Sequence, residues 1–449
     1  MPPRTPASSN QLPRSSTKRV SIVGLGKLGL SLAAVLADSG YQVRGIELDR
    51  SKVDAVNRGE SPIYEPGLKE LIRKNAESLS ASASFVGQIA DTDATFVVVP
   101  TPSDDSGAFS TELVEKAMTS VGRELTKKKG YHLVVLTSTV GPGSMEGVVK
   151  PTLERASGKR VGAEIGLCYN PEFIALGDVI RGLREPDFLL IGESDKKAGD
   201  ALSWIQKTVC TNSPPIERME FVNAELAKIA VNSFVTMKMS FANTLAEISE
   251  KMAGGNVDKI TAAIGRDKRI GSAYLKGATG WGGPCFPRDN IAFAHYATQV
   301  GAQAMIAEAT HEVNLLQAAR LIALLKKKGV RSGTKVGILG LSYKPNTNVV
   351  EQSQALLLAQ RLGEEGDDVM VYDPAAVESA RPILKDSVRY ARSAEELVRK
   401  SDFIVLATPW PEFQKLSPRL FRGKAVFDCW RFFGDGVKKA SRYASIGTA

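Results

Sequence analysis

A glycine-rich turn between a short apolar strand and a helix constrains the fold of this chain most. Residues 19–23 form the apolar run, and Gly24, Gly26 and Gly29 follow with GxGxxG spacing before a helical segment. In this context the first glycine makes the turn, the second admits a pyrophosphate, and the third lets helix and strand pack closely. The free N–H groups at the helix start favour a bound phosphate. The turn therefore predicts a dinucleotide-binding α/β domain.

An acid at the end of the second expected strand bears on which dinucleotide binds. That strand covers residues 42–47, and Glu47 ends it. A carboxylate at this position accepts hydrogen bonds from ribose hydroxyls and would repel a 2′-phosphate. Arg44 and Arg50 nearby leave NADP as an alternative, and a Rossmann-like fold without a cofactor is another. The pattern favours NAD.

The same βα pattern occurs at both ends of the chain. In the first half, further apolar strands are expected at residues 94–99 and 133–136. The C-terminal part repeats the pattern of a strand, a glycine turn and an acid. Its strands are expected at residues 335–340, 368–373, 403–409 and 424–428. Continuous Val, Ile and Leu runs that alternate with helices are typical of a parallel sheet covered on both faces. We therefore expect two doubly wound Rossmann-like α/β domains.

A long proline-free segment separates these two domains. Residues 217–252 are expected to form one helix, because apolar side chains recur at steps of four and three. The apolar positions are Leu226, Ala230, Phe234, Met237, Phe241, Leu245, Ile248 and Met252. Such a stripe fits packing within the domain or a dimer surface, and the period alone favours packing within the domain.

Composition argues against several classes of protein. Hydrophobic residues make up 43% and no apolar run is long enough to cross a membrane, so we expect no membrane span. The four cysteines lack CxxC spacing and only three histidines accompany them, which argues against a disulfide framework or a metal site and favours a reducing cytoplasm. Part of the net charge of +9 lies in a Pro- and Ser-rich N-terminal segment, expected to be a disordered tail. No aromatic and basic array indicates nucleic-acid binding.

Residues 280–289 (GWGGPCFPRD) carry the strongest chemical signal. Cys285 follows a glycine pair, and Arg288 nearby favours its thiolate form. If a helix begins after Pro287, Cys285 and Asp289 lie on one face of it. Glycines without side chains also allow a bulky ligand to approach the backbone closely. By itself the segment fits a catalytic thiol and a packed, buried cysteine equally well.

Other polar residues stand where they can join this chemistry. Lys228 and Asn232 lie four residues apart on the long helix, and residues 137–140 and 170–173 follow expected strands, where open α/β sheets border the ligand crevice. A dinucleotide together with a nucleophilic cysteine indicates oxidation past the aldehyde. An alcohol would give an aldehyde, the thiolate would capture it as a thiohemiacetal, and a second hydride loss would give a thioester for hydrolysis.

Taken together, the ordered motifs resemble the UDP-glucose/GDP-mannose dehydrogenase family. They run in the family's order from about Lys18 to Phe433 and comprise residues 24–29, 138–140, 170–173, 225–228, 282–289 and 340–344. Residues 59–68 resemble the UDP-glucose 6-dehydrogenase branch in particular. The resemblance implies a cytoplasmic, NAD-dependent four-electron oxidation of UDP-glucose to UDP-glucuronate for polysaccharide biosynthesis. It also implies a homodimer formed by the central helix, which reverses the preference for packing within the domain.

The resemblance implies a role for each matching residue. The catalytic set is Cys285 as nucleophile, Lys228 and Asp289 for protons and oxyanion charge, Thr139 through an ordered water, Glu172 for the hydrolytic water, and Asn232 for the substrate or thioester oxygen. The expected cofactor contacts are Gly24, Gly26, Lys27, Leu28, Gly29, Glu47, Lys52, Thr101 and Thr139. The expected substrate contacts are Glu172, Phe173, Lys228, Asn232, Arg269 (reaching into the partner's site), Tyr274, Lys276, Gly282, Lys344 and Arg431.

The same resemblance sets the expected boundaries and reveals two departures. We expect a tail at residues 1–17, a NAD-binding domain at 18–215, a central helical, dimerisation and catalytic-cysteine domain at 216–325, and a UDP-sugar-binding domain at 326–449. The family has an acid where this chain has Leu176 and an arginine where it has Glu351. We hypothesise that these two residues were lost as a linked pair.

Three alternative functions remain open at the level of sequence. The same reaction on a UDP-N-acetylhexosamine or GDP-mannose is the nearest, although Pro284 disfavours the UDP-N-acetylmannosamine branch, whose members often have histidine before the cysteine. A single-oxidation β-hydroxyacid dehydrogenase would give Cys285 and Lys344 no role. A nucleotide-sugar-binding regulator without turnover would not need Cys285, Lys228 and Asp289 together.

Overall fold

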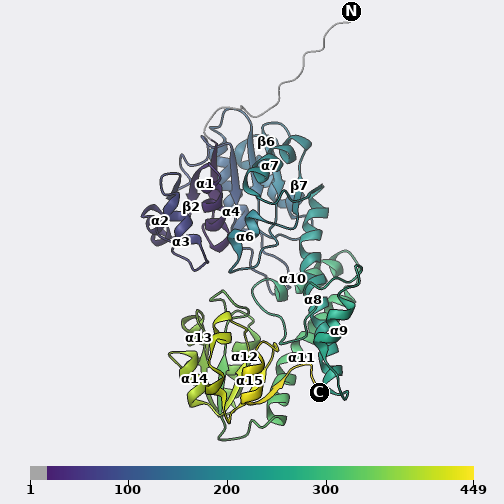
Figure 1. Cartoon of the computed structure of the whole chain (residues 1–449). Coiled ribbons are helices and arrows are strands. Elements are labelled where there is room, and N and C mark those ends of the chain that lie inside the picture. Colours follow the sequence, from purple (N-terminus) through teal and green to yellow (C-terminus); the bar gives the residue numbers. More distant parts are fainter. Residues whose placement is uncertain (1–17) are drawn as a thin grey trace, which may run out of the picture. The chain divides into compact units, whose positions relative to one another are not determined.

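The computed structural model describes residues 18–449, so the tail expected at residues 1–17 lies outside the described residues. The described chain forms two compact units, each with its own β-sheet (Figure 1). The first unit ends at Lys228. The second contains Ile229–Ala449 together with the short segment Ser103–Ala108.

The first unit contains an eight-stranded sheet of order β3-β2-β1-β4-β5-β6-β7-β8. All neighbouring strands are parallel except the pair β6 and β7. The strands are β1 (Arg19–Val23), β2 (Gln42–Ile46), β3 (Leu79–Ser82), β4 (Ala94–Val97), β5 (His132–Leu136), β6 (Ile165–Tyr169), β7 (Leu189–Glu193) and β8 (Ile216–Met219). Strands β1 to β6 have the Rossmann order 3-2-1-4-5-6, as the glycine turn predicted.

Helices cover both faces of this sheet. One apolar cluster packs the sheet against α1, α3, α6 and α7, and another packs it against α4, α5 and η1. The helical segments are α1 (Lys27–Asp38), α2 (Arg50–Asn57), α3 (Leu68–Lys74), α4 (Glu112–Leu125), η1 (Met145–Val149), α5 (Lys150–Ser157), α6 (Val179–Arg184) and α7 (Lys196–Val209). Burial on both faces explains why the central strands β4, β5 and β6 are mainly apolar and buried at every position.

The second unit contains a six-stranded, all-parallel sheet that repeats this topology. Its order is β11-β10-β9-β12-β13-β14, again the Rossmann arrangement. The strands are β9 (Lys335–Leu339), β10 (Asp368–Tyr372), β11 (Arg389–Tyr390), β12 (Phe403–Leu406), β13 (Ala425–Asp428) and β14 (Arg442–Ser445). The flanking segments are α12 (Gln354–Glu364), α13 (Val377–Leu384), α14 (Ala394–Lys400), η2 (Pro411–Lys415), η3 (Pro418–Phe421) and α15 (Asp435–Ala440).

Four further helices lie between the two sheets in the sequence. They are α8 (Phe221–Glu250), α9 (Val257–Ile264), α10 (Phe286–Gln299) and α11 (Met305–Lys327). The long helix predicted from residue 217 starts later, because residues 216–219 pair with β7 as strand β8. A segment without proline can form a helix, but it can equally form a strand where the edge of a sheet is available for pairing. Residues 216–219 do this at the edge of β7.

Helix α8 has an unusual distribution of side chains. The apolar stripe seen in the sequence is largely exposed, with Phe234 59%, Phe241 53% and Met252 60% accessible. The buried face carries polar side chains instead, including Glu225, Lys228, Asn232, Ser233, Thr236, Ser240 and Asn243. The preference for packing the apolar stripe within the domain is therefore wrong, since a stripe on this face points to solvent in the single chain.

Among the helices of the described residues, none combines the length and the apolar character that crossing a membrane requires.

Candidate functional site

The turn between β1 and α1 has the geometry of a dinucleotide cradle. Gly24 has φ +92°, and a Cβ there would lie 2.3 Å from the Val98 carbonyl oxygen. A Cβ on Gly29 would lie 1.9 Å from the Gly24 oxygen, whereas one on Gly26 would meet no atom within 4 Å. Gly26 caps α1 without a side-chain hydrogen bond, so the helix N-terminus is open to a phosphate. These residues fit the pyrophosphate of a dinucleotide.

Glu47 follows β2 beside this turn, as predicted. Its carboxylate accepts the N–H groups of Leu25 at 3.0 Å and Asp49 at 3.1 Å, which holds it next to the glycine loop. The residue remains partly exposed, so its oxygens are accessible to ribose hydroxyls. In the second sheet Asp373 has the equivalent place and accepts the N–H of Leu341, but it is buried. Of these two acids only Glu47 is partly exposed, and its contact with a ribose stays a prediction.

Other predicted cofactor residues lie on neighbouring loops of the first unit. The Thr101 hydroxyl donates to the Thr139 carbonyl at 2.7 Å and so joins the segments that follow β4 and β5. Lys27 lies at the start of α1, where burial lowers its pKa and Glu65 opposes that shift. Lys52 lies on α2 and is partly exposed.

Glu172 and Lys228 form the charged part of the site in the first unit. Burial raises the pKa of Glu172 to about 8, and the positive charge of Lys228 counteracts this only in part. The residue as a whole stays partly exposed, so the desolvation concerns its carboxyl group. The Lys228 ammonium lies 4.9 Å from the centre of the Phe173 ring, a cation–π contact. A carboxyl group with this pKa is suited to exchange protons near neutral pH.

Two glutamates that sequence reasoning left without a role hold these segments in place. Glu65 accepts the N–H groups of Gly177 and Val179, both at 2.9 Å, and thus fixes the loop that follows Glu172. On α8, Glu225 accepts those of Gly143 and Met145, both at 2.7 Å, and thus fixes the segment that follows Thr139. Both glutamates lie inside motifs quoted for the family resemblance. The sequence held one signal for their structural role: each is an acid in a family motif to which no catalytic or binding role was assigned.

Cys285 caps the N-terminus of α10 in the second unit, where a helix was expected from Pro287 onward. Its carbonyl accepts the N–H of Asp289 at 2.8 Å, which confirms that the two residues are one helical turn apart. The Asp289 carboxylate is buried and accepts the Asn232 amide at 2.6 Å. Arg288 contributes a longer ion pair to it at 3.4 Å. The structure therefore brings together Asn232 and Asp289, predicted from separate motifs, while Cys285 is exposed.

The glycine pair ahead of Cys285 is packed by the chain itself. A Cβ on Gly282 would lie 2.0 Å from the Gln352 carbonyl oxygen, and Gly283 donates its N–H to Glu351 at 3.0 Å. We expected these glycines to let a ligand approach the main chain closely. In the structure the loop that follows Lys344 makes this close approach instead. The predicted contact between Gly282 and substrate stays a prediction.

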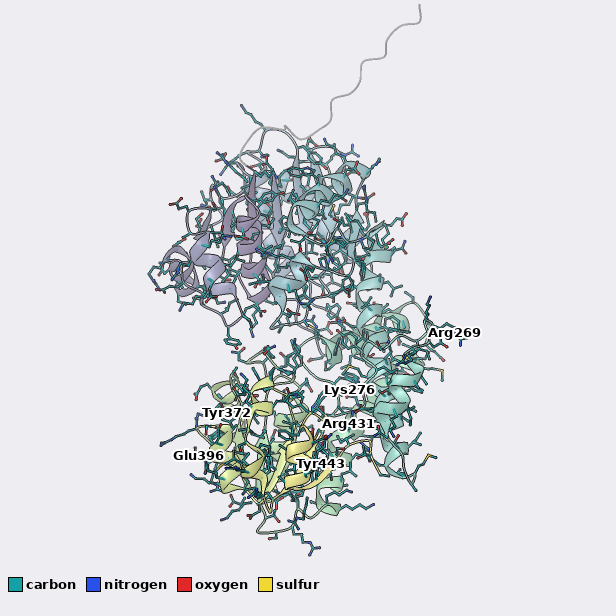
Figure 2. The ribbon with its side chains drawn as sticks, viewed as in Figure 1. Arg269, Lys276, Tyr372, Glu396, Arg431 and Tyr443 are labelled. Atoms are coloured by element: carbon teal, nitrogen blue, oxygen red, sulfur yellow. The ribbon has the colours of Figure 1, made fainter. Side chains whose placement is uncertain are left out.

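The predicted substrate residues occupy several places in the second unit. Tyr274 has φ 59° and packs edge-on against Phe286, with ring centres 6.3 Å apart. Lys276 is exposed and lies near Arg431 (Figure 2). Arg269 pairs with Asp267 at 2.7 Å and its side chain is 88% exposed. Lys344 follows the turn after β9 and is partly exposed.

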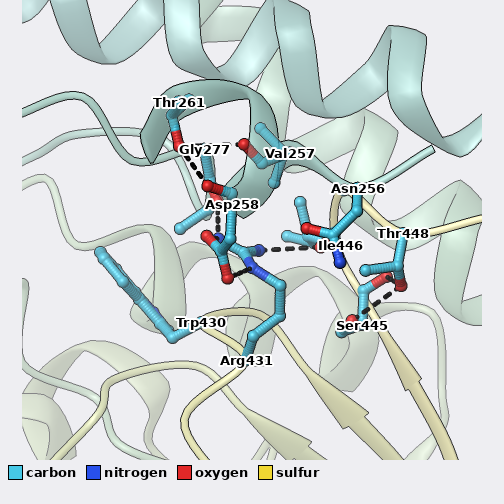
Figure 3. A network of polar contacts seen from close by, with 12 residues as sticks. Asn256, Val257, Asp258, Thr261, Gly277, Trp430, Arg431, Ser445, Ile446 and Thr448 are labelled. Atoms are coloured by element: carbon cyan, nitrogen blue, oxygen red, sulfur yellow. Dashed lines mark hydrogen bonds and ion pairs between the residues drawn. The ribbon is translucent and has the colours of Figure 1, made fainter. Parts of the chain in front are cut away.

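Arg431 makes contacts that the sequence did not predict. Its guanidinium pairs with Asp258 at 2.7 Å and donates to the carbonyls of Gly277 at 2.6 Å and Ile446 at 2.8 Å (Figure 3). Only 6% of its side chain is exposed. Arg431 therefore links α9, the Lys276 loop and the chain beyond β14, and its contact with sugar stays a prediction.

The two departures from the family pattern lie in different units. Leu176 packs against the apolar cluster that contains α1 and α6. Glu351 is exposed, and its main-chain carbonyl binds Gly283. The hypothesis that they were lost as a linked pair stays a prediction.

The glycine cradle of the first unit, with Glu47 beside it, defines a dinucleotide-binding protein of the Rossmann class. Comparison with known families agrees with this class. Three models of the UDP-glucose/GDP-mannose dehydrogenase family match: the NAD binding domain at residues 18–210, the central domain at 222–315 and the UDP binding domain at 337–435. The chain belongs to this family, and NAD is its cofactor.

Individual relatives match over nearly the full length of the chain. UDP-glucose 6-dehydrogenase AglM of Haloferax volcanii is 38% identical over 413 residues, which cover 91% of this chain and 96% of the relative. A GDP-mannose 6-dehydrogenase of Pseudomonas syringae pv. syringae is 30% identical and covers 95% and 99%. The structure of a UDP-glucose dehydrogenase from Pyrobaculum islandicum superposes with a TM-score of 0.88 at 34% identity, covering 98% and 100%.

Proposed function

We propose that this protein is a UDP-glucose 6-dehydrogenase that oxidises the sugar C6 alcohol to a carboxylate with two NAD. The observation that carries the proposal is Cys285, an accessible thiol one helical turn before the buried Asp289–Asn232 pair. A chain that stopped at the aldehyde would not need such a thiol. The relatives named for UDP-glucose support the choice of substrate.

NAD, once held by the glycine cradle, would supply the hydride acceptor for each of the two oxidations. The alcohol first loses a proton and a hydride to become an aldehyde. The Cys285 thiolate then adds to the carbonyl carbon, forming a C–S bond, while the oxygen takes a proton to give a thiohemiacetal. Loss of the second hydride and of that proton gives a thioester. Water breaks the C–S bond, releasing the acid and restoring the thiol.

The remaining side chains hold protons, charge or substrate. Glu172, with its raised pKa, takes the proton of the hydrolytic water. Lys228 stabilises developing oxyanion charge, and Asp289 orients the Asn232 amide toward the substrate oxygen. Thr139 takes part in proton transfer during the first oxidation. The cations and hydrogen-bond donors proposed to hold the UDP-sugar are Arg269, Tyr274, Lys276, Lys344 and Arg431, together with Phe173 and Gly282.

We also propose that two copies associate through α8. Its exposed apolar stripe comprises Leu226, Phe234, Phe241 and Ile248, and Met252 continues it just beyond the end of the helix. Large apolar stripes of this kind typically mark an interaction surface, and a helix can pair with its own copy by two-fold symmetry. The domain boundaries expected at 215 and 325, and the cytoplasmic location, stay predictions.

The substrate proposal is tested by initial rates of NADH formation with a panel of UDP-glucose, GDP-mannose and UDP-N-acetylmannosamine. We expect the highest kcat/KM with UDP-glucose. The relative named for GDP-mannose makes that sugar the second candidate. A higher kcat/KM with GDP-mannose would replace the proposed substrate while keeping the reaction.

A further inference from the structure

The segment between Lys276 and Cys285 is held by side chains from two helices outside it. On α8, Asn243 accepts the N–H of Ala278 at 2.8 Å and donates to the Thr279 carbonyl at 3.3 Å. On α11, Asn314 accepts the N–H of Trp281 at 2.8 Å and donates to the Trp281 carbonyl at 3.0 Å. Each amide therefore binds both a donor and an acceptor of the main chain, as a neighbouring strand would.

Both contacts are buried. Asn243 is 1% exposed and Asn314 5%, so neither amide can exchange its main-chain partner for water without opening the structure. The Trp281 indole adds a third anchor, because its N–H donates to the Ser240 hydroxyl at 2.9 Å. Ser240 in turn donates to the Thr310 carbonyl on α11 at 3.0 Å, which ties the same two helices together.

Glycines make room for these contacts. A Cβ on Gly280 would lie 2.6 Å from the Asn314 side-chain oxygen. A Cβ on Gly277 would lie 2.5 Å from the Ala242 carbonyl oxygen on α8. The glycines of this segment thus permit a close fit to α8 and α11, in addition to the fit of Gly282 against Gln352.

We propose that Asn243 and Asn314 are positioning residues that fix residues 278–281 and thereby the places of Lys276 and Cys285. Neither asparagine needs to touch substrate. Lys276 lies two residues before the Asn243 contacts, and Cys285 lies four residues after the Trp281 contacts. The catalytic part of this inference rests on the proposed function, whereas the clamp itself does not.

The clamp is tested first by hydrogen exchange of the main-chain N–H groups, followed by mass spectrometry of peptides that cover residues 278–285. We expect exchange to accelerate by at least about 10-fold in Asn314→Ala and in Asn243→Ala, because two hydrogen bonds are lost in each. Asn314→Asp, which keeps the shape, is the second variant if truncation prevents folding. Leu384→Ala, a buried residue of α13, controls for a general loss of stability. Wild-type exchange rates in the asparagine variants would overturn the clamp.

The positioning role is tested by turnover of the same variants. We expect kcat to fall about 10- to 100-fold, since small displacements of a reacting group have effects of this size. We also expect fewer NADH per sugar as aldehyde escapes capture, with an unchanged KM for NAD. A kcat no lower than that of Leu384→Ala would overturn the role. If the wild-type protein fails to oxidise UDP-glucose, the proposed function is refuted but the clamp is not. The hydrogen-exchange experiment still tests whether Asn243 and Asn314 hold residues 278–281.

Discussion

Glu172 shows how one buried carboxyl group can set the pH dependence of the reaction. Because burial raises its pKa to about 8, the group is largely protonated at neutral pH and becomes a base above it. We predict that the rate of thioester hydrolysis in single-turnover experiments rises with pH and levels off above about pH 8. Glu172→Gln should remove this limb of the pH profile. A profile that is unchanged in the variant would show that another group is the base.

The same raised pKa has a consequence for stability. Between the ordinary pKa of 4.5 and about 8, the folded protein binds a proton at Glu172 that the unfolded chain does not. The contribution of Glu172 to the free energy of unfolding therefore falls as pH rises through this window. We predict that urea unfolding of Glu172→Gln, compared with wild type, shows a smaller loss of stability between pH 5 and pH 8. An equal loss in both proteins would contradict the assignment.

The buried carboxylate of Asp289 is paired with the side-chain amide of Asn232, which lies on another helix. Its carboxylate binds the Asn232 amide, and an amide in its place would lose the charge that orients this donor. We predict that Asp289→Asn lowers kcat about 10²- to 10⁴-fold with the fold intact. Asp105→Asn, at an exposed aspartate, is the matched control. Wild-type kcat in Asp289→Asn would remove Asp289 from the catalytic set.

Among the elements, α8 shows both what the sequence could predict and what it could not. The period of its apolar residues predicted a long helix, and a helix over Phe221–Glu250 is confirmed. The period could not say which face is buried, because apolar and polar stripes have the same repeat. The buried stripe is largely polar. Glu225, Asn232 and Asn243 in it bind groups that are far away in the sequence.

Glu225 offers a test of how α8 is joined to the segment after Thr139. Burial raises its pKa, although the N–H groups of Gly143 and Met145 stabilise the charged form. We predict that Glu225→Ala lowers the free energy of unfolding by about 2–3 kcal/mol, because two buried N–H groups lose their acceptor. The measurement is urea unfolding at neutral pH.

Glu146→Ala is the matched control in the same region, since its ion pair with Lys150 is exposed. We expect a change below about 1 kcal/mol there. Equal effects of the two substitutions would show that Glu225 contributes no more than a surface charge.

At the scale of the molecule, the apolar stripe of α8 predicts the oligomeric state. We predict that Phe234→Asp combined with Phe241→Asp converts a dimer to monomers, because two charges would be buried at the interface. Light scattering coupled to size-exclusion chromatography measures this directly. Ile383→Asp, at an apolar residue with a comparable exposure of 46%, should leave the dimer intact. Monomeric wild-type protein would contradict the proposed interface.

The sequence predicted the fold more fully than the site. Strand runs, glycine turns and acids recur locally, so both Rossmann sheets and the boundaries of β1 could be read from short segments. The contacts of Glu65 with Gly177 and of Asn314 with Trp281 join residues far apart in the chain. No local pattern records such pairs, so these supporting residues could not be predicted, whereas Cys285 and Asp289 stand together in one short motif and could be proposed from it.

The measurement that tests the central claim most directly is the yield of NADH per UDP-glucose consumed, with wild-type protein and Cys285→Ala side by side. Two hydride transfers joined by a covalent intermediate predict two NADH and one UDP-glucuronate per substrate in the wild type. The same account predicts no net formation of the acid in Cys285→Ala. One NADH per substrate in the wild type, or undiminished acid formation in the variant, would contradict it.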